Sequence, residues 1–183
     1  MTIPSRFMTA EEFERTRLPD GLWEVIDGKL LEVSPSGGVH TAITGTVIFR
    51  LSDHVTSARL GTILLPTSGI VLAEEPLTMR SPDTGVIRAD RLPLDQIPHG
   101  LFRVIPDLAV EVISHGEPAS EVLDRVMTWV EAGVKLLWVI AAEKAVFVFA
   151  AGQQPHMMTF EHTLDGGDVL PGFQLPVRDI FAV

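Results

Sequence analysis

The feature that most constrains this chain is an apolar strand that carries one acidic side chain. Residues 106–114 read PDLAVEVIS, and Val110, Val112 and Ile113 are typical of a strand buried in a sheet. Glu111 stands among them. A carboxylate is rarely left inside such a strand without a partner, because burying an unpaired charge is costly. The segment therefore predicts a sheet and a specific partner or ligand for Glu111.

A second acidic residue precedes another short apolar run. The tripeptide SPD ends at Asp83, just before the apolar residues 85–87. Two carboxylates at or near the ends of two strands are suited to a divalent metal, because hard cations take carboxylate oxygens as ligands. The Asp83 and Glu111 pair is the strongest chemical hint that the residues give by themselves.

Local patterns predict three helices. A capping-box sequence, TAEE, begins a short helix at Thr9 that extends to about Arg17. A four-residue spacing of apolar side chains predicts a helix from His40 to about Ala58. A third helix is predicted over Pro118–Ala132, since proline suits the first turn and a glycine follows. Its side chains expected to pack on the sheet are Val122, Val126, Trp129 and Val130.

Strands fill most of the remaining sequence. Asp27-Gly28 is a typical two-residue hairpin turn between strands 22–26 and 30–33. Two further strand pairs are predicted, 62–65 with 70–73, and 136–141 with 145–149 across residues 142–144, besides a strand at 157–160. Residues 74–79 and 90–105 are predicted as loops. No repeat or linker interrupts the pattern, which predicts one α/β domain over residues 1–183.

Composition limits the classes of protein that remain. With 183 residues and 46% hydrophobic content, the chain can bury a full core. It has neither the roughly 18 uninterrupted apolar residues of a membrane helix nor a signal sequence, so we expect a cytoplasmic protein with no membrane partner. Zero cysteines exclude disulfides and thiolate metal sites, and the six histidines lack the spacing of a zinc site.

The net charge of −10 argues against a nucleic-acid coat protein, because binding phosphates needs a basic surface. The charge still allows a nuclease, in which metal ions and a local basic patch can offset the carboxylates.

Taken in order, several motifs resemble the Uma-two family of endonucleases within the PD-(D/E)XK superfamily. The similarity runs from about Thr9 to the C-terminus and rests on WEVIDG at 23–28, His40, RSPD at 80–83, PDLAVEVIS at 106–114, WVEAGV at 129–134 and DVLPGF at 168–173. No single motif is specific for the family, but the order and spacing of all of them together are. The resemblance implies a restriction-endonuclease-like fold, with a central mixed sheet flanked by helices, and a homodimer.

The resemblance also implies roles for named residues. Asp83 and Glu111 would bind Mg²⁺ or Mn²⁺, which polarises a phosphodiester and activates water. Glu24 would support the metal or its waters, and His40 would contact a phosphate or act as a general acid or base. Each has a plainer interpretation: a turn residue for Asp83, a sheet-edge residue for Glu111, a solvated face for Glu24 and a surface histidine for His40.

Asp107 is a rival to Glu111, because an even spacing along a strand can put both on one face of the sheet. Asp107 stands at the start of the strand, however, where an aspartate commonly caps a turn. We therefore expect it to be structural.

The lysine of the superfamily motif does not follow Glu111, where the sequence continues VIS. In the family that this chain resembles, the lysine stands on the next helix, four residues before the aromatic, and Arg125 takes that place. Arginine keeps the charge and can stabilise a developing anion, but it cannot exchange a proton near neutral pH. The plainer interpretation is a helix-surface arginine paired with Glu121.

The sequence thus predicts a metal-dependent endonuclease acting on nucleic acid, most readily DNA. Two alternatives stay open. The first is a catalytically weak or inactive module that serves binding or dimeric interaction, favoured by the arginine substitution and the acidic charge. The second is a small-molecule hydrolase with the same metal pair.

Overall fold

The computed structural model describes residues 8–141 and 144–182. Its larger sheet has six strands in the order β10-β9-β8-β7-β6-β3. Their bounds are β3 (Gly61–Leu64), β6 (Thr84–Arg88), β7 (Leu108–Ile113), β8 (Leu136–Ala141), β9 (Ala145–Ala150) and β10 (His156–Met158). The neighbours β7 and β8 are parallel and are joined by α3 (Ala119–Glu131), while the other pairs are antiparallel. The sheet is therefore mixed, as predicted.

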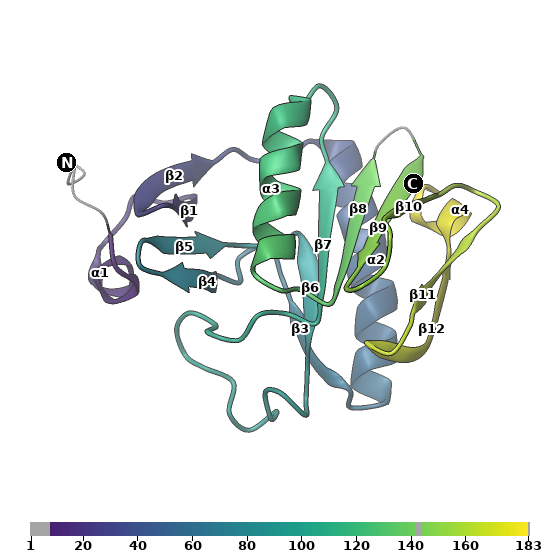
Figure 1. The fold of residues 1–183 in the computed structure, drawn as a ribbon, viewed down its shortest axis with the longest axis horizontal. Coiled ribbons are helices and arrows are strands. Elements are labelled where there is room, and N and C mark those ends of the chain that lie inside the picture. The colour runs from purple at the N-terminus through teal and green to yellow at the C-terminus, as the bar shows by residue number, and fades with distance from the viewer. Residues whose placement is uncertain (1–7, 142–143, 183) are drawn as a thin grey trace.

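A second sheet has four strands in the order β2-β1-β5-β4 and lies beside the first (Figure 1). Its strands are β1 (Leu22–Ile26), β2 (Lys29–Val33), β4 (Ile70–Glu74) and β5 (Leu77–Arg80), and α1 (Ala10–Arg15) precedes them in the chain. Towards the C-terminus, β11 (Thr163–Gly166) and β12 (Leu170–Pro176) form a hairpin that is followed by α4 (Val177–Ile180). None of the described helices has the length and apolar content needed to cross a bilayer.

Two helices cover opposite faces of the larger sheet (Figure 1). Apolar side chains of α2 (Gly38–Ser57), spaced by four residues, pack with Val110 and Val112 of β7 on one face. Val126 and Trp129 of α3 pack with Ala109 of the same strand on the other face. Successive side chains of a strand alternate between faces, so this packing directs Glu111 towards α3.

Several predicted elements match the structure. The hairpin turn is made by Asp27 and Gly28, whose φ angles are 49° and 73°, and the helices predicted near residues 9–17, 40–58 and 118–132 are present. Residues 89–107 contain no helix or strand, although Phe102 forms a bridge to Ile70 and Leu92 is buried. Of the turn predicted at residues 142–144, positions 142 and 143 lie outside the described residues.

Three predictions were wrong. Strands β3 and β4 do not pair with each other, because β3 pairs with β6 and β4 pairs with β5 in the second sheet. The segment 74–79 is mostly strand, since β5 begins at Leu77 and is fully buried. Val130 does not pack on the sheet: it is 41% exposed, whereas Val126 and Trp129 are buried and Val122 is half-buried.

Candidate functional site

Asp83 lies at the junction between the two sheets, after β5 of the smaller and directly before β6 of the larger. Its Oδ2 accepts a hydrogen bond of 2.7 Å from the backbone N–H of Val112 on β7. The Nε2 atom of His40, at the beginning of α2, lies 3.1 Å from the same oxygen. The Asp83 carboxylate is therefore fixed beside the residue that follows Glu111.

Glu111 is buried beneath α3, with 4% of its surface exposed. The indole N–H of Trp129 donates to its Oε1 at 2.7 Å, and Arg125 Nε lies 2.9 Å from its Oε2. Burial raises the pKa of Glu111 to about 8, and the positive charge of Arg125 opposes that rise. The interpretation as a sheet-edge residue is wrong, since β7 lies inside the larger sheet.

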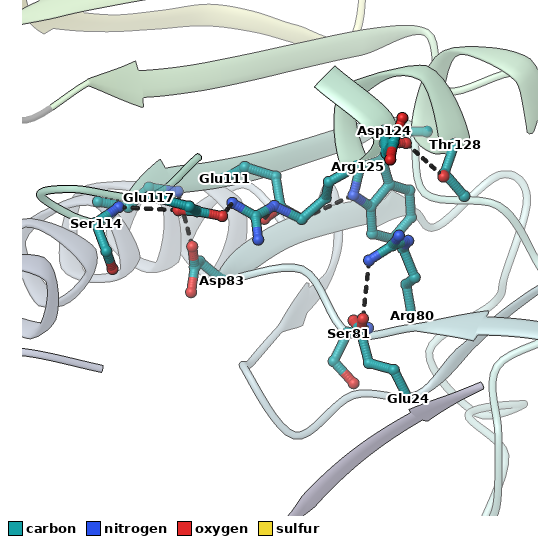
Figure 2. Close-up of polar contacts among 12 residues, drawn as sticks. Glu24, Arg80, Ser81, Asp83, Glu111, Ser114, Glu117, Asp124, Arg125 and Thr128 are labelled. Atoms are coloured by element: carbon teal, nitrogen blue, oxygen red, sulfur yellow. Dashed lines mark hydrogen bonds and ion pairs between the residues drawn. The ribbon is translucent and has the colours of Figure 1, made fainter. Parts of the chain in front are cut away.

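Arg125 has two acidic partners, Glu111 and Glu117 (Figure 2). The two contacts differ in kind. Its Nη2 donates a hydrogen bond to Glu117 Oε1, whereas its Nε is within ion-pair distance of Glu111 but is not aligned for a hydrogen bond. Glu117 is itself held by the backbone N–H of Ser114, which donates to its Oε2 at 3.2 Å. Arg125 thus lies against Glu111 and Glu117, and among the described contacts it makes none with Glu121, its partner in the plainer interpretation.

Among the described residues Glu24 makes no hydrogen bond or ion pair with Asp83 or Glu111, but its charge contributes to the raised pKa of Glu111. It is not on a solvated face. It is 7% exposed and its Oε2 accepts a hydrogen bond of 2.8 Å from Arg80 Nη1. Its Oε1 accepts one of 3.0 Å from the N–H of Ser81. Burial raises the pKa of Glu24, against the effect of Arg80. Glu24 therefore holds the segment that leads to Asp83, and it lines a small cleft of about 80 Å³ together with Asp83.

His40 is part of the same group and is not an isolated surface side chain. Only 10% of its side chain is exposed, and the hydroxyl of Thr44, one helical turn later, lies 3.4 Å from its Nδ1. The hydrogen bond to Asp83 is the main cause of a raised pKa for His40. Since Asp83 favours the charged imidazolium, His40 is suited to hold or donate a proton next to this carboxylate.

Asp107 belongs to a separate cluster, as expected for a structural residue. It is fully buried, and its Oδ2 accepts a hydrogen bond of 2.9 Å from the N–H of Arg88. Its Oδ1 forms ion pairs with Lys135 at 2.8 Å and Arg91 at 3.2 Å. Four residues of strand, about 13 Å, separate it from Glu111.

Sequence reasoning did not identify Arg80 and Glu117 as part of this group. Arg80 ends a strand that was predicted as a loop, so its burial at 8% exposure had no signal in the sequence. Glu117 precedes α3 and therefore falls outside the three- and four-residue spacings that mark partners on one helix.

The site lies between two clefts. One, of about 730 Å³, runs between β1, β2 and α3 and is lined by Glu24, Arg80 and Arg125. The other, of about 810 Å³, includes His40, Glu117 and the loop at residues 34–38. Glu121 lines both clefts. A substrate in the first cleft would meet Arg80 and Arg125, and one in the second would meet His40. Asp83 itself lines a third, smaller cleft of about 80 Å³ together with Glu24.

The donors of the site fit a magnesium or manganese ion bound through few protein ligands. Asp83 Oδ1 has no partner among the described contacts, and Glu111 Oε2 has only the unaligned ion pair with Arg125. Mg²⁺ commonly binds through one or two carboxylates together with waters and substrate phosphates. Within the described residues no group of three or more His, Cys, Asp or Glu is arranged to hold a metal ion. The described residues therefore do not supply a complete set of protein ligands for a metal ion.

Comparison with known proteins gives the fold and the family. The structure is similar to the crystal structure of "a putative nuclease belonging to DUF820 from Anabaena variabilis ATCC 29413", with a TM-score of 0.80 and 20% identity over 95% of this chain and 97% of that one. No curated protein matches. The family model Uma2, described as "Putative restriction endonuclease", matches residues 10–178. This chain therefore belongs to the Uma2 family and has its restriction-endonuclease-like fold.

Proposed function

We propose that the protein is a Mg²⁺- or Mn²⁺-dependent endonuclease that hydrolyses phosphodiester bonds of nucleic acid, most readily DNA. The observation that carries this proposal is that Asp83 and Glu111 lie at neighbouring strands, close enough for the charge of Asp83 to raise the pKa of Glu111, with Arg125 against Glu111. Membership of a nuclease family supports a nucleic-acid substrate.

We assign each residue of the site a different role in hydrolysis. Asp83 and Glu111 would hold the ion, which when bound polarises the phosphodiester and lowers the pKa of water. Arg125 is positioned to stabilise the negative charge that develops on the phosphate. His40 holds a proton next to Asp83 and is suited to give it to a departing oxygen. Glu24 binds the backbone at Ser81 and so positions Asp83.

Removal of metal tests the proposal directly. We expect the protein to nick supercoiled plasmid in Mg²⁺ or Mn²⁺, and we expect the nicking to stop in excess EDTA and to return when metal is added back. Gel electrophoresis of the plasmid over time measures the rate. A Glu111→Gln protein prepared in the same way is the control for contaminating nuclease, and nicking that persists in EDTA or in this variant would exclude the proposed mechanism.

A second candidate function, a weak or inactive nuclease fold that serves as a binding or dimeric module, is favoured by one observation. Arg125 occupies Glu111 Oε2, an oxygen that a metal ion would need. Arginine also cannot transfer a proton near neutral pH.

Substitution of Arg125 by lysine tests whether the missing proton-transfer group limits the rate. We expect Arg125→Lys to nick plasmid at least about tenfold faster, because a partly buried lysine can exchange a proton and general acid–base catalysis contributes about a hundredfold or more. The rate is compared with that of the parent at equal metal concentration. An unchanged rate in a folded variant would mean that charge is all this position contributes.

A further inference from the structure

Glu117 has no counterpart among the residues that the sequence assigned to the site, yet it makes the best-aligned contact of Arg125. Only 13% of the Glu117 side chain is exposed, and both of its oxygens are used. Oε1 accepts a hydrogen bond from Arg125, and Oε2 accepts one from the N–H of Ser114. A glutamate held in this way cannot swing freely between solvent and the site.

The contact of Arg125 with Glu111 is of a different kind. The distance of 2.9 Å is that of an ion pair, but the Arg125 N–H is not directed at the Glu111 oxygen. Glu111 is held independently by the indole of Trp129. Breaking the Arg125–Glu111 contact therefore loses an electrostatic attraction but no aligned hydrogen bond, and neither side chain loses its other support.

Arg125 therefore has one partner that holds it in place, Glu117, and one whose contact can break more easily, Glu111. We propose that Glu117 is a positioning residue that anchors Arg125 in the site when a divalent ion takes Glu111 Oε2. This inference rests on the proposed metal-dependent function. Without the anchor, Glu111 is the only acidic side chain of the described residues within ion-pair distance of Arg125, so Arg125 competes directly with the ion for that carboxylate.

Divalent-ion affinity, measured without substrate, tests the anchor. We expect Glu117→Gln to weaken Mn²⁺ binding about tenfold, within the range of coupling between contacting charged groups. Glu121→Gln is the matched control, because it removes the same charge one helical turn before Arg125 at an exposed residue with no described contact to Arg125. Isothermal titration with Mn²⁺ at constant pH gives the dissociation constants, and thermal unfolding verifies that each variant is folded.

A double-mutant cycle shows whether Glu117 acts through Arg125. In the Arg125→Met background, we expect Glu117→Gln to change Mn²⁺ affinity no more than Glu121→Gln does. An equal loss in both backgrounds would mean that Glu117 acts only through its own charge and would overturn the proposal. If Glu117→Gln unfolds, Glu117→Asp replaces it, because it keeps the charge but shortens the reach, and parental affinity in that variant would also overturn the proposal.

Failure of the underlying function gives a different result. If the parent shows no saturable Mn²⁺ binding that Asp83→Asn removes, the metal-dependent function fails and the role of Glu117 fails with it. If the parent binds Mn²⁺ through Asp83 but Glu117→Gln matches Glu121→Gln, only the role of Glu117 is lost.

Discussion

Asp83→Asn should lower metal-dependent nicking by more than about a hundredfold, which is the upper end of the loss caused by removing an outer-shell partner of a metal site. Asparagine keeps an oxygen that can accept the hydrogen bond from Val112, so the junction between the sheets should survive. The charge that would bind the ion is lost. Plasmid nicking and Mn²⁺ titration should fall together.

The control for Asp83→Asn is Asp53→Asn, which makes the same change at an exposed position on α2. It should nick and bind Mn²⁺ like the parent. If instead Asp83→Asn retained cleavage while folded, the chemistry would not depend on this carboxylate, and the proposed metal site at Asp83 and Glu111 would be wrong.

Asp107→Ala should lower the free energy of unfolding by about 3 kcal/mol, because it leaves the partly buried N–H of Arg88 and two cationic side chains without the carboxylate that they contact. We expect a smaller decrease in the free energy of unfolding than for a fully buried ion pair, because the side chains of Arg91 and Lys135 are 34% and 52% exposed and water can solvate them. Urea denaturation followed by circular dichroism measures it.

Asp107→Asn separates charge from hydrogen bonding at the same position. Asparagine still offers an acceptor to Arg88, so we expect roughly 1 kcal/mol of destabilisation. Both variants should keep the Mn²⁺ affinity of the parent at temperatures where they are folded. A loss of affinity with full stability would place Asp107 in the functional site and would contradict its structural role.

The elements that the sequence predicts well are those whose pattern is local. The turn at Asp27-Gly28 needs only two residues with positive φ, and the apolar spacing of α2 is complete within one helix. The pairing of β3 was missed because its partner β6 is decided by the arrangement of the whole sheet. β5 was missed because its burial depends on strands on both sides.

The candidate site shows the same division. The resemblance identified Asp83, Glu111, His40 and Arg125, and the structure brings these four side chains into one group. Glu24 was predicted to support the metal or its waters, and it lines a cleft with Asp83, but its position is determined by Arg80, 56 residues away. No spacing rule reaches that far, and none connects Glu117 with Arg125 across the start of a helix. The geometry of these partners had to come from the fold.

The position of Asp83 between two sheets has a consequence for when the site exists during folding. Glu111 and Arg125 come from one continuous β7–α3–β8 unit and can meet early, because the chain between them is short. Asp83 joins them only when β6 has paired with β7, since its contact with Val112 spans 29 residues, and Ser81 beside it is held by Glu24 of the smaller sheet. A nascent or partly unfolded chain would therefore carry a half-site without its second carboxylate, and cutting would begin only with the finished molecule.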